Sequence, residues 1–170
     1  MTTATLDNRY AGWGLFRTSG ATWGVSEDAE KLAAFFGSIA RDAWKTSAGY
    51  HRYSQPIQEL MDVYRDCSSE NWDGEGASAV TESVLDDAVT LLFLLPPSIQ
   101  NPTFQPEPAG AIALEWYKDP KRVLLLSVNG TRSIQYAGLL GDGNETHGKV
   151  NFAGSLPRAI QDLLDAYAKV

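Results

Sequence analysis

Four side chains in the second half of the chain have the chemistry of catalysts or metal ligands: Asp73, Glu107, Glu115 and His147. Two carboxylates can act together as a general acid and base, or bind a hard cation through their oxygens. Histidine exchanges its proton near neutral pH, which makes His147 the strongest single catalytic candidate. One interpretation is therefore a small hydrolase or metal-dependent enzyme that uses His147 with one of the three carboxylates.

The sequence around these side chains favours structural roles. The segment Asn71-Trp72-Asp73-Gly74-Glu75-Gly76 is typical of a turn, in which the Asn and Asp accept backbone hydrogen bonds, the Trp fills the core and the glycines supply positive φ. The carboxylates lack the alternating spacing of a calcium loop, and no nucleophile motif adjoins His147. Cys67 has neither a base nor a cationic neighbour beside it. We therefore predict no catalytic residue, metal site or cofactor.

The composition is that of an acidic globular protein. The chain has 170 residues, of which 44% are hydrophobic, a formal net charge of −7 and one cysteine. This charge disfavours direct binding to nucleic acid or to anionic membranes, because both need clustered cations. The longest apolar run, at 88–95, is too short to span a bilayer, and the N-terminus lacks the features of a signal peptide. We expect a cytoplasmic protein.

Helical spacing of apolar residues predicts four helices, at 27–44, 57–67, 80–95 and 157–168. Pro56 suits the first turn of the second helix, and Pro96 ends the third. Residues 96–110 contain five prolines and are expected to form an extended connector.

Alternating apolar residues predict strands at 111–117, 122–128, 132–139 and 149–152. Asn129-Gly130 is the best hairpin turn signal in the chain, and the strand at 122–128 is apolar on both faces, as a central strand would be. Helices followed by strands indicate an α+β fold, in which an antiparallel meander of three to four strands packs on helices and a C-terminal helix follows. This single domain is expected to span 26–170.

Two surfaces are candidates for binding a protein partner. The glycine-rich residues 1–25, an arm or a hairpin, carry Trp13, Phe16 and Trp23, and such aromatic residues are enriched at binding hot spots. The alternative is that they close over the first helix. Glu82, Asp86 and Asp87 are expected on the wet face of the helix at 80–95, where they would attract a basic partner.

Several ordered motifs resemble an uncharacterised family of small bacterial proteins. The similarity covers about residues 70–165. The motifs are Asn71-Trp72-Asp73-Gly74-x-Gly76-Ala77, Pro106-Glu107-Pro108-x-Gly110-x-Ile112-x-Leu114-Glu115-Trp116, Leu126-Ser127-Val128, Tyr136-Ala137-Gly138 and His147-Gly148. The resemblance implies one common fold and a bacterial origin, and it carries over no catalytic residue. Ala109 departs from the Asp or Asn common there in the family, which weakens any cation-binding role for this turn.

The sequence therefore favours a non-enzymatic protein-binding module. We expect an antitoxin, immunity protein or inhibitor, including the anti-CRISPR type, from a bacterial or phage accessory locus. Its partner would be a basic protein, such as a toxin or a nucleic-acid-binding machine. The enzyme described above is one alternative, and an oligomeric scaffold subunit that assembles through a sheet edge is another. A homodimer is compatible with each of them.

Overall fold

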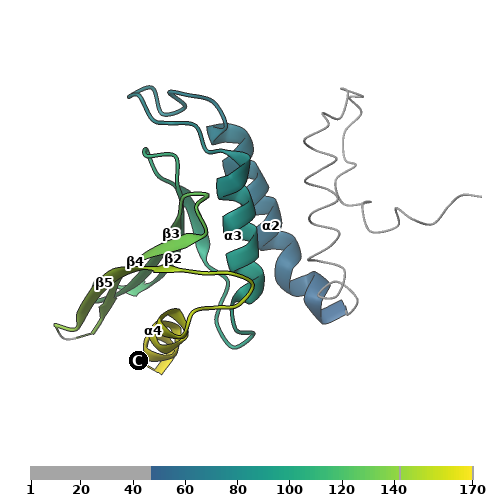
Figure 1. Cartoon of the computed structure of the whole chain (residues 1–170). Coiled ribbons are helices and arrows are strands. Elements are labelled where there is room, and N and C mark those ends of the chain that lie inside the picture. Colours follow the sequence, from purple (N-terminus) through teal and green to yellow (C-terminus); the bar gives the residue numbers. More distant parts are fainter. Residues whose placement is uncertain (1–46, 142, 170) are drawn as a thin grey trace, which may run out of the picture. The chain divides into compact units, whose positions relative to one another are not determined.

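The computed structural model describes residues 47–141 and 143–169, with side chains from residue 52 onward. They belong to one compact unit, Asp42–Val170. Its elements follow the chain in the order given in Figure 1: α2 Ser47–Cys67, α3 Glu82–Leu94, β1 Thr103–Pro106, β2 Ile112–Asp119, β3 Arg122–Val128, β4 Ser133–Leu140, β5 Glu145–Asn151 and α4 Arg158–Lys169. The expected arm at 1–25 and helix at 27–44 lie outside the described residues.

The α+β class is confirmed, but the strand number is wrong. The sheet is antiparallel and has five strands, in the order β1-β2-β3-β4-β5. The additional strand is β1, which lies within the proline-rich connector and pairs Phe104 with Leu114. Because β1 is at the edge of the sheet, its outer backbone groups need no partner strand, and prolines are tolerated there. The prolines of this segment favour a connector over a strand, and for this reason the short edge strand was not predicted.

Two elements begin earlier than the sequence indicated. α2 starts at Ser47 and continues through Pro56, because buried Tyr53, Ile57 and Leu60 extend one apolar stripe across the proline. β5 starts at Glu145 rather than at 149. Its residues are all exposed or half-buried, so the apolar alternation that predicts strands is weak there. The bounds of α3 and α4 agree with expectation to within two residues.

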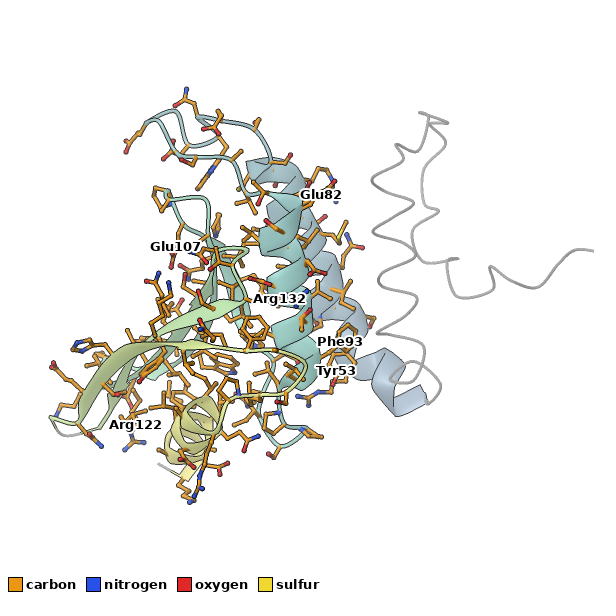
Figure 2. The ribbon with its side chains drawn as sticks, in the orientation of Figure 1. Tyr53, Glu82, Phe93, Glu107, Arg122 and Arg132 are labelled. Carbon is orange, nitrogen blue, oxygen red and sulfur yellow. The ribbon has the colours of Figure 1, made fainter. Side chains whose placement is uncertain are left out.

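α3 lies at the centre of the core and packs against both α2 and the strands β2 and β3 (Figure 1). Its fully buried leucines share the core with leucines of the sheet: Leu85, Leu91, Leu92, Leu114, Leu124 and Leu126. Tyr53 of α2 contacts Phe93 of α3, with ring centroids 4.7 Å apart (Figure 2). Among the described helices, none is both long enough and apolar enough to cross a membrane.

α4 covers the end of the sheet through Ile160, Leu164 and Tyr167, which are buried. Lys118 of β2 donates a hydrogen bond to the Tyr167 carbonyl oxygen at 3.3 Å, and its ammonium lies 5.1 Å from the centre of the Tyr167 ring. A positive charge at the last carbonyls of a helix is favourable. These contacts fix the C-terminal helix to β2.

Candidate functional site

The loop after α2 is held in one conformation by its own polar groups. The Asp73 carboxylate accepts hydrogen bonds from the main-chain N–H groups of Glu75 (2.8 Å) and Ala77 (3.0 Å). The Asn71 side-chain oxygen accepts one from Gly76 (2.7 Å). The predicted turn roles of Asn71 and Asp73 are confirmed, and Gly76 has the predicted positive φ, 98°. Asp73 therefore has a structural role in this loop.

Trp72 does not fill the core. Its side chain is only half-buried, and its indole N–H donates to the Ser78 carbonyl oxygen at 3.1 Å. The loop closes on itself through this bond and through the bond from the Val80 N–H to the Cys67 carbonyl oxygen. The Trp72 side chain thus links two parts of the loop and does not enter the helix–sheet interior.

The bonds at Asp73 predict a pH dependence of stability. Hydrogen bonds from the N–H groups of Glu75 and Ala77 hold the pKa of Asp73 below its ordinary value of 3.8. A carboxyl with a lowered pKa in the folded state contributes stability above its unfolded pKa, and this is lost as pH falls through the folded pKa. We expect Asp73→Asn to remove this loss below about pH 3.8, measured by urea unfolding as a function of pH.

Asp73→Ala provides the comparison for that measurement. Asn keeps an oxygen that can accept the two loop bonds, whereas Ala keeps none, so the Ala variant should be the less stable of the two at pH 7. If the wild type and both variants show the same slope of unfolding free energy below pH 3.8, the Asp73 carboxylate does not stabilise the loop.

The other two candidate carboxylates are engaged within the sheet. Glu107 accepts a hydrogen bond from the Ser127 hydroxyl at 2.9 Å, and Glu115 accepts one from the Gln105 side chain. Glu107 thus links the β1–β2 turn to β3, and Glu115 links β2 to β1.

His147 lies far from Glu115. Glu115, Leu125, Ala137 and His147 form one row across β2 to β5. Three strand spacings separate Glu115 from His147, which is about 14 Å and too far for direct proton transfer. Among the residues whose placement is described, no three His, Cys, Asp or Glu side chains form a group suited to a metal ion.

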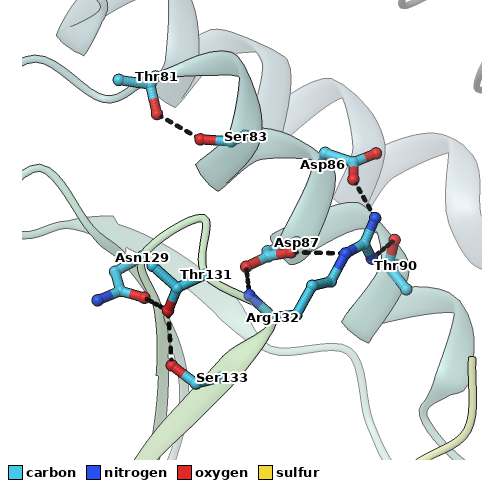
Figure 3. Close-up of polar contacts among 9 residues, drawn as sticks. All are labelled: Thr81, Ser83, Asp86, Asp87, Thr90, Asn129, Thr131, Arg132 and Ser133. Atoms are coloured by element: carbon cyan, nitrogen blue, oxygen red, sulfur yellow. Dashed lines mark hydrogen bonds and ion pairs between the residues drawn. The ribbon is translucent and has the colours of Figure 1, made fainter. Parts of the chain in front are cut away.

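Two of the three carboxylates expected on the acidic face of α3 pair with one arginine, Arg132 (Figure 3). The Asp87 side chain is buried, with 1% exposure, so the expectation that it faces solvent is wrong. It accepts a hydrogen bond from the Arg132 main-chain N–H at 2.9 Å and pairs with the Arg132 side chain at 3.3 Å. Asp86 pairs with the same guanidinium, which also donates to Thr90. Of the three acidic residues, only Glu82 is exposed.

The β3–β4 turn brings Arg132 to α3. Gly130 has a φ of 78°, and a Cβ atom there would lie 2.4 Å from the Ser83 hydroxyl oxygen, so the turn packs directly on the first turn of the helix. Arg132 itself has a φ of 54°.

Burial raises the pKa of Asp86, with a further rise from Asp87 and an opposing effect from Arg132. We name Asp86, Asp87 and Arg132 the carboxylate clamp, because they join helix and sheet.

One face of the sheet is left uncovered by the described helices. The buried side chains of β2, β3 and β4 alternate with exposed or half-buried ones, apart from the small Ala113 and Ser133. On this open face, Tyr117 is 61% exposed and Leu139 36% exposed. Val123 lies between them in the same row, and half-buried Leu125 adjoins. We name these four side chains the apolar patch.

The sequence analysis missed the apolar patch. The apolar strand β3 indicated burial on both faces, but the described helices cover only one of them. A usable signal was present in β2 and β4. Tyr117 follows the buried Trp116, and Leu139 follows the buried Gly138, so both belong to the face opposite the core. Two apolar side chains at solvent-facing positions of adjacent strands indicate a contact surface.

Two carboxylates stand beside the patch, and the surface around it is shallow. Glu115 is opposite Leu125 on β2, and Glu145 is opposite Leu139 on β5. A cavity of about 160 Å³ lies beside Leu139, between the two hairpin ends. It is smaller than the roughly 300–1,000 Å³ of ordinary small-molecule sites. The patch therefore suits contact with a macromolecule better than enclosure of a small ligand.

Cys67 is not a reactive nucleophile in this structure. Cys67 is a buried free thiol, and burial, together with the charge of Asp66, raises its pKa, which disfavours the reactive thiolate. Trp13, Phe16 and Trp23 lie outside the described residues.

No protein-family model matches the chain, and neither a curated protein nor a solved structure shows significant similarity to it.

Proposed function

We propose that this protein is a non-enzymatic protein-binding module whose apolar patch contacts a basic protein partner. The observation that carries the proposal is the pair of exposed apolar side chains, Tyr117 and Leu139, in one row of the uncovered sheet face. A large aromatic residue that is already held by a rigid strand loses little conformational entropy on binding. Tyrosine is also enriched among the residues that dominate binding energy.

The charge distribution supports a basic partner. Residues 1–46 contain five acidic and five basic residues, so the whole net charge of −7 arises from residues 47–170. Glu115 and Glu145 stand beside the patch. A partner surface with an apolar centre and a basic rim complements this arrangement, and opposite charges speed association at low salt.

An antitoxin, immunity protein or inhibitor, including one of the anti-CRISPR type, would act by covering such a partner surface. We infer a bacterial or phage accessory protein of this class, acting in the cytoplasm on a toxin or on a nucleic-acid-binding machine. Proteins that bind nucleic acid present clustered Lys and Arg, which are the groups that an acidic rim attracts.

Replacing both Tyr117 and Leu139 with alanine should weaken partner binding by about 30-fold or more, because truncated hot-spot residues typically cost at least 2 kcal/mol. Partners are first recovered from the host by cross-linking and quantitative mass spectrometry with the full chain. The affinity of the purified partner is then measured by calorimetry for the wild type and the double variant.

Arg158→Ala is the matched control, because Arg158 is an exposed residue of α4, away from the open face. It should leave the affinity unchanged, and thermal unfolding should show that all three proteins are folded. The proposal fails if every recovered protein binds the double variant as tightly as the wild type.

His147→Ala separates the enzyme alternative, since a binding module retains its full inhibitory effect without an imidazole at that position.

A further inference from the structure

The two edges of the sheet differ in their capacity to pair with another strand. β1 has four residues, follows Pro102, ends at Pro106, and contacts α2. Short edge strands, prolines and covering helices all prevent edge pairing. β5 has seven residues without a proline, and none of them is buried. Within the described part of the chain, it has β4 as its one strand neighbour. Of the two edges of the described sheet, β5 is therefore the one that can pair with a further strand.

The hydrogen bonds at both ends of the β4–β5 hairpin establish which backbone groups point outward. The Phe152 N–H donates to the Arg132 carbonyl oxygen, and the Leu140 N–H donates to the Asn144 carbonyl oxygen. Bonded and non-bonded pairs alternate along an antiparallel ladder. The even-numbered residues of β5 therefore bond to β4. The N–H and C=O groups of the odd-numbered residues, Glu145, His147, Lys149 and Asn151, face outward.

We propose that β5 pairs in antiparallel fashion with β5 of a second copy, about a two-fold axis through His147. In this register Glu145 of each copy lies opposite Lys149 of the other, and all three central pairs use outward backbone groups. Opposite charges directly across strands are stabilising. The proposal goes beyond the contact with a basic partner, because it uses the sheet edge and not the apolar patch.

The charges of β5 select this register over its neighbours. An axis through Glu145 or through Lys149 would place two like charges opposite each other, which is destabilising. An axis through Gly148 would place Lys149 opposite His147, and Glu145 opposite the neutral Asn151. Only the axis through His147 forms two Glu–Lys pairs. Closed two-fold symmetry is also the commonest arrangement of homo-oligomers.

The pairing would join the two sheets into one and place both apolar patches on the same face. A two-fold axis perpendicular to the sheet keeps the open faces of the two copies on one side. The dimer would then present two equivalent patches, so that a partner with two matching surfaces binds more tightly than one patch allows.

Charge reversal tests the register. Glu145→Lys alone and Lys149→Glu alone each replace two attractive pairs with two repulsive ones, and should weaken dimerisation by about tenfold or more. The double variant Glu145→Lys with Lys149→Glu restores two opposite-charge pairs and should return to within about threefold of the wild type. Sedimentation equilibrium of the full chain over a range of concentrations measures the dissociation constants.

Reversing the exposed ion pair of α4, Arg158→Glu with Asp162→Lys, is the control and should leave dimerisation unchanged. Circular dichroism confirms folding of each variant. A wild type that is monomeric at every concentration contradicts the proposal, and so does a double variant as weak as the single ones. Retained dimerisation of the Tyr117 and Leu139 double-alanine variant separates this result from the partner contact.

Discussion

Replacing Arg132 with alanine should lower the free energy of unfolding by about 3 kcal/mol, measured by urea unfolding at neutral pH. The substitution leaves the Asp87 carboxylate buried without its cationic partner, and removing one member of a buried ion pair costs about 3–5 kcal/mol. We expect the lower end of this range, because the Arg132 side chain is 47% exposed. The backbone conformation contributes little to the difference, since alanine and arginine are strained alike at a φ of 54°.

Two further variants show whether charge burial is the cause. Adding Asp87→Asn to Arg132→Ala should recover about 1 kcal/mol or more, because the site then holds no unpaired charge and the amide oxygen still accepts the main-chain N–H of residue 132. Arg158→Ala removes an exposed ion pair of α4 and should cost less than about 0.5 kcal/mol. Simple additivity of the two clamp substitutions would contradict a buried-charge penalty at Asp87.

The second large effect is expected at Leu126, a fully buried leucine of β3. Leu126→Ala should lower the free energy of unfolding by about 2–5 kcal/mol, because it removes buried methyl groups and leaves a cavity between sheet and helices. Leu125→Ala, one residue earlier on the same strand, should cost about 1 kcal/mol, because its half-buried side chain already meets solvent. Urea unfolding of both variants gives the comparison.

This neighbouring pair tests the one-sided packing of the sheet. The two substitutions delete the same atoms from the same strand, so helix or strand propensity and chemistry are matched. Equal losses of stability would mean that both faces of β3 are covered in the folded protein. The apolar patch would then not be available to a partner, and the proposed contact would fail with it.

Local structure was largely predictable because it depends on short-range periodicity. The apolar spacing of 80–95 and 157–168 located α3 and α4, and Asn129-Gly130 located the β3–β4 turn. The turn at Asp73 was predictable because short polar side chains bond to main-chain groups a few residues away. Errors arose where an element lacks its usual pattern, as at Pro56 inside α2, in the proline-rich β1 and in the polar strand β5.

The sequence by itself determined the α+β class, the turn chemistry of Asn71 and Asp73, and the acidity of residues 47–170. The tertiary structure decided which faces of these elements meet. Helical spacing shows that Asp86 and Asp87 are adjacent on α3, but only the packed β3–β4 turn supplies Arg132 to them. Likewise, an apolar strand shows that a side chain prefers burial, while the positions of the helices decide that Leu126 is covered and Tyr117 is exposed. Contacts between distant segments depend on how whole elements pack, and no local pattern specifies that packing.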